Sequence, residues 1–182
     1  MTLRSIPVLL TALFTGGLAH GATLQQISMD QMSRSATAVV RARVVGVSTS
    51  VSGSTIYTRY KLSVSESWKG ATPSEVVLPG GNLNGQSQSF PGVPVLHAGG
   101  EYVLFLWTSA STGLTHIIGL TQGLFLVASQ PDGSAMVSRK ESGELMLDAN
   151  GRRVSDQAIS MNLTDLKARV HQALAGTPTS AK

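Results

Sequence analysis

Cysteine is absent from this sequence of 182 residues. Its absence excludes a disulfide framework, a catalytic thiol and a thiolate metal site. The fold must therefore be held together by noncovalent contacts alone.

Charged residues are scarce as well, at 13% of the chain, and the formal net charge is +4. A nucleic-acid-binding surface needs a much more basic balance, so we expect no nucleic-acid partner. Serine, threonine and glycine are frequent instead, a composition typical of strands and turns.

The N-terminus has the three parts of a secretory signal peptide. A positive charge precedes the apolar run Ile6–Leu18, and small residues follow it. The alternative, an uncleaved membrane anchor, needs about 20 apolar residues, and glycines interrupt this run too early. We predict cleavage after Gly21 or Ala22, and a secreted or periplasmic protein whose mature chain has no transmembrane anchor. The expected organisation is a signal peptide over 1–22, one β-rich domain over 23–176 and a disordered tail over 177–182.

Thr55–Trp68 is the clearest strand signal in the chain. Its alternate residues are mostly apolar, namely Ile56, Tyr60, Leu62, Val64 and Trp68, whereas the residues between them are mostly polar. Such period-two alternation predicts a half-buried strand. The turn Ser52-Gly53-Ser54 joins it to a second predicted strand, Val39–Val47, so we expect a hairpin.

Shorter segments complete the predicted fold. Further strands are expected at Glu75–Leu78, Tyr102–Trp107 (fully buried), Thr115–Leu120, Leu124–Ser129, Ala135–Arg139, and at Leu145–Leu147 and Arg152–Val154 around the hairpin turn Asn150-Gly151. Helical spacing predicts a short N-terminal helix (Leu24, Ile27, Met29, Met32, Ala36) and a C-terminal amphipathic helix (Leu163, Leu166, Val170, Leu174). Ser28 and Asp30 are cap candidates for the first; Asn162 or Thr164 begins the second and Gly176 ends it. The fold class is therefore mainly β: a small OB-like barrel or closed β meander with one helix at each end.

The segment 79–100 is rich in glycine and proline. It lacks the lysine and following helix of a phosphate-binding P-loop, so we interpret it as a long surface loop. Four of its residues are too apolar for an idle loop: Phe90, Val93, Val95 and Leu96. We expect this part to fold back over the barrel as a lid or a plug.

The chain carries no recognisable catalytic or metal motif. His97 and Glu101 are four residues apart, but two glycines separate them at a strand entry, so they share no helical face. Glu66 has the same parity as the inward residues of its strand, which would raise its pKa beside Trp68 and make it an acid. The alternative is that Glu66 reaches solvent or pairs with Lys69. We assign no catalytic, cofactor-binding or metal-binding residue and expect no cofactor.

Four cations and one tyrosine form the candidate ligand-binding surface. Alternation places Arg41 and Arg43 on one face of the first strand, and Arg59, Lys61 and Tyr57 on the matching face of the second. We expect the two rows to adjoin with no acid between them. The surface is either a solvated sheet face that resists aggregation or a site for an anionic glycan.

Three quoted segments, "ATAVVRARVVGVSTS", "STIYTRYKLSVSESWKG" and "GEYVLFLW", together with "IIGLTQGLFLV", resemble a group of uncharacterised secreted bacterial proteins. The resemblance covers roughly residues 36 to 128 and implies no function. The order of elements is also distantly similar to the OB-fold of tissue inhibitors of metalloproteinases and netrin-like modules. Those inhibitors bind the protease zinc through an N-terminal cysteine, which this chain lacks, so their mechanism does not carry over.

These observations lead to two functional hypotheses. The first is an exported soluble β-barrel module that binds an extracytoplasmic ligand, such as an anionic glycan, or another envelope protein. The alternative is a hydrolase of envelope or extracellular polymers, with Glu66, Glu101, His97 and His116 as the available groups.

Overall fold

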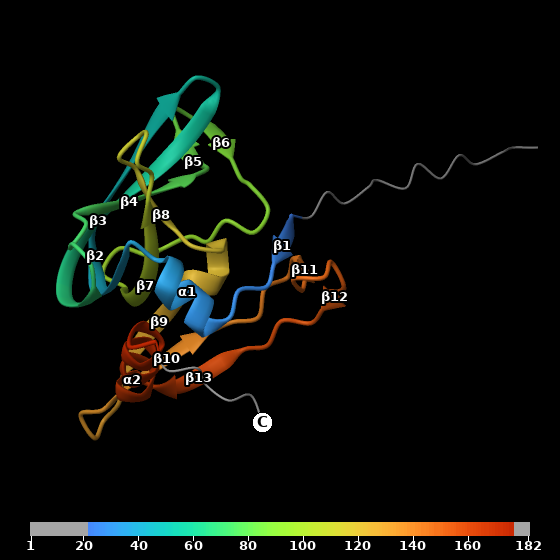
Figure 1. The fold of residues 1–182 in the computed structure, drawn as a ribbon. Helices are drawn as coiled ribbons and strands as arrows, with labels where there is room; N and C mark the ends of the chain where they lie inside the picture. Colours follow the sequence, from blue (N-terminus) through green and yellow to red (C-terminus); the bar gives the residue numbers. More distant parts are fainter. Residues whose placement is uncertain (1–21, 177–182) are drawn as a thin grey trace, which may run out of the picture.

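The computed structural model describes residues 22–176 of the chain (Figure 1). The predicted signal peptide and its cleavage site, and the predicted tail, lie outside these residues except for Ala22. Within them, no helix is both long and apolar enough to cross a membrane.

The fold is mainly β, as predicted, and is organised around one eight-stranded sheet. The strand order is β13-β10-β9-β7-β2-β3-β4, and β8 pairs with β7 beside this path. The strands are β2 (Ala38–Ser52), β3 (Thr55–Lys69), β4 (Glu75–Pro79), β7 (Glu101–Thr108), β8 (Thr115–Ile117), β9 (Leu124–Ser129), β10 (Ala135–Arg139) and β13 (Ile159–Asn162). A 3-10 turn, η1 (Leu120–Gly123), precedes β9 and takes the place of the last part of the predicted strand Thr115–Leu120.

The β2–β3 hairpin is the longest part of the sheet and projects away from the helices (Figure 1). It confirms the predicted hairpin, but its register shifts at three places, between Val39 and Val40, Arg41 and Ala42, and Val44 and Gly46. Bulges of this kind change which residues face each side. As a result Trp68 packs in a different cluster from Leu62, so the single inward face expected for β3 is wrong at its C-terminal end.

The two faces of the sheet carry separate hydrophobic clusters. One cluster lies within the curl of β2, β3, β4, β7 and β8; it includes Val40, Leu62, Leu78 and Leu104. The other lies under the helices α1 (Met29–Ser35) and α2 (Leu163–Leu174), and includes Val39, Phe105, Phe125 and Leu166. β7 serves both clusters, so Tyr102–Leu106 is buried on both sides, as predicted, while Trp107 is exposed.

The expected closed barrel is not formed by strand pairing. In the described part of the chain, the ladder ends at β4 on one side and β13 on the other. β8 nevertheless lies beside β4, because the His116 ring contacts the Val77 carbonyl through Nδ1 at 2.9 Å. The sheet is therefore curled around its first cluster but open between these two strands.

Local signals account for both helices. Ser28 caps α1 in a capping box with Gln31, while Leu24 lies before the helix, in β1. α2 starts after Asn162 and is followed by Gly176 at a φ of 77°, as the sequence predicts. A separate three-stranded sheet joins β1 (Thr23–Gln25), β11 (Leu145–Leu147) and β12 (Arg153–Val154), which includes the predicted Asn150-Gly151 hairpin.

Candidate functional site

A groove of about 400 Å³ lies along the concave side of the β2–β3 hairpin, in the half that contains its turn, which we call the distal half. Strand residues form one wall, among them Val47, Thr58, Tyr60 and Leu78. The segment Ser89–Leu96 forms another; all of its residues except Pro91 and Gly92 line the groove. We call this cavity the hairpin groove. Its volume is within the range of small-ligand and side-chain pockets.

A small hairpin that the sequence analysis missed closes the end of the groove. β5 (Gly81–Leu83) pairs with β6 (Gln86–Gln88), within the segment that we interpreted as loop. Asn84 and Gly85 between them have φ angles of 52° and 78°, as a type I′ turn requires. The Asn-Gly pair was therefore the signal for this hairpin.

Two contacts fix β5 and β6 to the main hairpin. The Gln88 amide accepts a hydrogen bond from the Ile56 N–H at 2.7 Å and donates one to the Ser54 carbonyl at 2.7 Å. Gly81 packs so closely that a Cβ there would lie 2.4 Å from Thr58 Oγ1. A side chain at this position would push β5 off the concave face, so glycine is required for the groove to keep its shape.

The segment 89–96 folds back over the sheet, as predicted. Leu96 is buried in the first cluster and Val93 packs against it. Phe90 and Val95 remain 40% and 68% exposed, and both line the hairpin groove. Apolar side chains that stay exposed at the rim of a cavity are typical of a binding surface.

The groove is apolar and uncharged. Tyr60 is its one ionisable lining residue among those that the structure describes, and burial raises the pKa of this tyrosine. The other polar groups are hydroxyls and amides, such as those of Thr49, Asn82 and Gln88. The site therefore suits a neutral, apolar group and offers no counterion to an anion.

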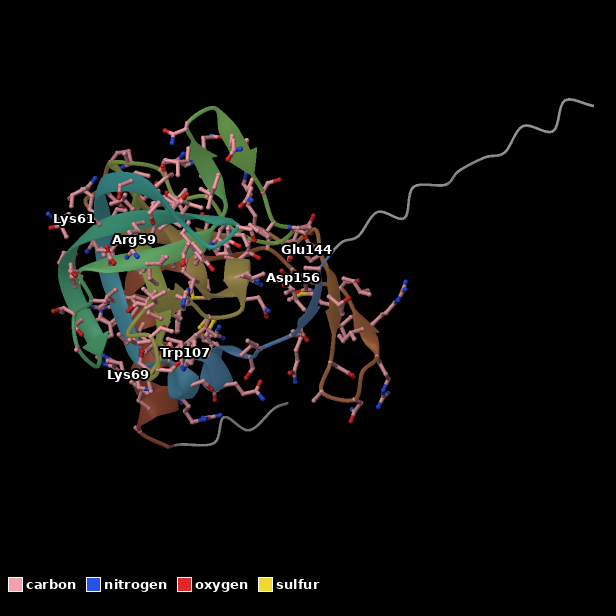
Figure 2. The ribbon with its side chains drawn as sticks, turned by 90° about the horizontal axis from the view of Figure 1, so that it is seen from above. Arg59, Lys61, Lys69, Trp107, Glu144 and Asp156 are labelled. Atoms are coloured by element: carbon pink, nitrogen blue, oxygen red, sulfur yellow. The ribbon has the colours of Figure 1, made fainter. Side chains whose placement is uncertain are left out.

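The predicted cation surface differs from expectation because acids lie within it. Glu101 on β7 accepts hydrogen bonds from Arg41 at 2.6 Å and from Arg43 at 2.8 Å, and Glu75 on β4 pairs with Arg59. The expectation of a surface without acids is wrong, because these carboxylates come from the strands that flank the hairpin. Figure 2 shows Arg59 and Lys61 on the same side of the molecule. Among the described residues, Lys61 has no carboxylate within 4.0 Å.

Glu66 belongs to the same charged network. The bulge in the hairpin places it opposite Arg41, and it accepts hydrogen bonds from Lys167 at 2.7 Å, Trp68 at 3.1 Å and Arg41 at 3.0 Å. The hydrogen bond from Lys167 is the largest cause that lowers the pKa of Glu66 to about 2. Glu66 is therefore ionised at neutral pH, and its pKa is lowered, whereas the hypothesis of an acid required it to be raised. Its partners also differ from the predicted one, since Lys69 instead donates to the Ser33 and Arg34 carbonyls at the end of α1.

The remaining candidates for chemistry each contact other groups. Glu101 accepts hydrogen bonds from Arg41 and Arg43. The His116 ring contacts the Val77 carbonyl and stacks on Trp107, with 6.2 Å between the ring centroids. His97 contributes its backbone N–H to the Tyr102 hydroxyl at 3.0 Å. In residues 22–176, no group of three or more histidines and carboxylates is placed to hold a metal ion.

No protein-family model matches the chain, and no curated protein is similar enough to it to count as a relative.

Proposed function

We propose that this protein is an exported binding module that holds a neutral, apolar group of an extracytoplasmic partner in the hairpin groove. The observation that supports it is the combination of exposed apolar side chains, Val47, Phe90 and Val95, around a cavity without charged lining residues. Exposing such side chains to water is unfavourable, and a bound apolar group would cover them.

A neutral fluorescent probe tests the groove directly. N-phenyl-1-naphthylamine fluoresces weakly in water and strongly in an apolar site, so the protein should enhance its emission. Val47→Asp places a carboxylate on the groove wall and should abolish the enhancement. Val45→Asp is the matched control, because Val45 is 53% exposed against 47% for Val47 but does not line the groove. Absence of enhancement in the wild-type protein, or equal loss in both variants, would overturn the proposal.

Export remains part of the proposal and rests on the N-terminal sequence. N-terminal sequencing of the protein from the periplasm or medium should give a chain that begins at Ala22 or Thr23. A chain that begins near Met1, or one found entirely in membranes, would contradict it.

Binding of an anionic glycan at Arg41, Arg43, Tyr57, Arg59 and Lys61 is a weaker proposal. Three of these cations already have carboxylate partners, so a polyanion would have to compete with Glu101 and Glu75. Lys61 is the cation best placed to contribute. Salt-sensitive binding to an anionic polysaccharide that Lys61→Ser weakens would support this surface, and unchanged binding would exclude it.

A hydrolase built on Glu66, Glu101, His97 and His116 is less well supported. Acid–base or nucleophilic catalysis needs such groups within hydrogen-bond reach of one another or of a common substrate atom. Within the described part of the chain, Arg41 joins Glu66 and Glu101, and each carboxylate is engaged in ion pairs.

We also infer a relationship in shape to OB-fold modules. The curled strands β4-β3-β2-β7 with β8 beside β4 support it, since OB-folds are five-stranded, partly open barrels. An experimental structure whose strand order differed from this one would remove the support.

A further inference from the structure

Within residues 22–176, the outer edge of β2 has no strand partner along the distal half of the hairpin. β7 pairs with β2 over Ala38–Arg43, and the backbone of Val44 exchanges hydrogen bonds with Gly99 and Gly100. From Gly46 to Ser52, the strand that pairs with β2 among the described residues is β3. Unpaired strand edges of this kind are templates for adding another strand.

Hydrogen bonds on β3 show which β2 residues point to this free edge. Ile56 directs its backbone toward β4, because its N–H donates to the Gln88 side chain and its carbonyl accepts from Gly80. The N–H of Leu62 likewise donates to Ser74 on that side. The direction of the backbone N–H and C=O groups alternates along a strand. Thr58 and Tyr60, the even-numbered residues between Ile56 and Leu62, therefore also point toward β4.

The residues opposite these positions point the other way, toward the free edge. Val47 lies opposite Tyr60, Thr49 opposite Thr58 and Val51 opposite Ile56. Val47, Thr49 and Val51 therefore present backbone N–H and C=O groups that face away from β3.

Two of these residues, Val47 and Thr49, also face the hairpin groove. Side chains directly opposite one another in a ladder lie on the same side of a sheet, and Val47 and Thr49 line the groove together with their partners Tyr60 and Thr58. The free edge and the groove are thus adjacent features of a single surface.

We propose that the occupant of the groove is an extended, uncharged peptide segment of another protein, which adds as an antiparallel strand to β2 at Val47–Val51. This inference rests on the proposed function and names its ligand class. A strand would pair with the free backbone groups of β2, and every second side chain would lie in the groove. The uncharged lining selects apolar side chains at those positions, and it disfavours charged ones that would lose their hydration there.

A short blocked peptide that alternates valine and threonine is the probe. In an antiparallel strand bound with its valines in the groove, the valine amides face β2 and the threonine amides face away. N-methylation of the valines should therefore weaken binding by about three- to tenfold for each hydrogen bond lost. Methylation of the same number of threonines is the matched control and should leave the affinity unchanged. Equal effects of the two modifications would overturn strand addition.

The Val47→Asp and Val45→Asp variants locate the peptide. Binding measured by calorimetry should be lost with Val47→Asp and kept with Val45→Asp. The peptide comparison above is made on the wild-type protein, so it stands even where a variant fails to fold.

The fluorescent probe separates the failure of this inference from the failure of the proposed function. Binding of the probe without binding of the peptide would overturn strand addition and leave the groove as a site for small apolar groups. Binding of neither would overturn both. A dimer that Val47→Asp dissociates, in a protein that does not bind the peptide, would assign the edge to a second copy of the chain and overturn the peptide proposal.

Discussion

The two halves of strand β2 have similar valine-rich sequences but opposite environments. In the proximal half, Ala38–Val44, the strand lies between β3 and β7, and Val39, Val40 and Ala42 are 0% exposed. In the distal half, Val45, Val47 and Val51 are 47–58% exposed beside a free edge. The difference arises because β7 pairs with the proximal half and does not extend along the distal half. It does not arise from strand propensity, since both halves are rich in valine. The distal valines are therefore the exposed part of this strand.

Truncation of an apolar side chain beside the proximal half or within the distal half should give the largest contrast between the halves of β2. Leu104 of β7 represents the proximal half. Leu104 lies opposite Val40 in the first cluster and is 0% exposed, so Leu104→Ala should cost about 3 kcal/mol of unfolding free energy. Val47→Ala should cost less than about 0.5 kcal/mol, because its side chain is already partly hydrated. Urea denaturation of both variants measures the two values. Similar losses would mean that the distal half is part of the core.

The charged network of the proximal half should have the next largest effect. Glu66→Gln leaves Arg41 and Lys167 with weaker partners, and we expect a loss of about 1–2 kcal/mol at neutral pH. The folded pKa of about 2 lies below the ordinary value of 4.5. The stabilisation is therefore fully present above pH 4.5 and is lost as the pH falls toward 2.

Denaturation of wild type and Glu66→Gln between neutral pH and pH 2 measures this. The gap between the two proteins should stay constant down to about pH 4.5 and close between there and pH 2. A gap that is independent of pH would show that the effect comes from packing instead of charge.

The ion pair of the distal half should contribute less. Arg59 and Glu75 are 37% and 42% exposed, and pairs of this exposure contribute roughly 0–1 kcal/mol. We expect Glu75→Gln to cost less than about 0.5 kcal/mol at physiological salt. A loss as large as that of Glu66→Gln would remove the electrostatic difference between the halves.

Local patterns were sufficient to predict most elements of the fold. Period-two alternation gave β3, and turn residues gave β9, β10 and the β11–β12 hairpin within one or two residues. The stripe of Leu163, Leu166 and Val170 gave α2, because one face of that helix is buried. Each of these signals depends on neighbours within a few positions, which a sequence displays directly.

The features that decide the candidate site depend on distant parts of the chain. The partners of Arg41 lie 25 and 60 positions away, at Glu66 and Glu101, and no local spacing predicts them. The bulges that turn Val47 toward the groove and Glu66 toward Arg41 come from the register of the hairpin. The β5–β6 hairpin is different, since the Asn84-Gly85 signal was present in the sequence but was interpreted as part of a loop.

Amide hydrogen exchange gives the smallest and most local test of the comparison. In the distal half, the amides of Val47, Thr49 and Val51 should exchange quickly, because they point to the free edge. Those of Ser48 and Ser50 point to β3 and should be protected, as should Val44, whose N–H donates to Gly100 at 2.9 Å. Residues 47–51 belong to one strand and pair with the same partner, β3. A difference in exchange between them therefore reports which amides are hydrogen-bonded. Uniform protection along Val47–Val51 would mean that the edge is already covered in the free protein. The valine–threonine peptide should slow exchange selectively at Val47, Thr49 and Val51, because a strand added at this edge would accept their hydrogen bonds.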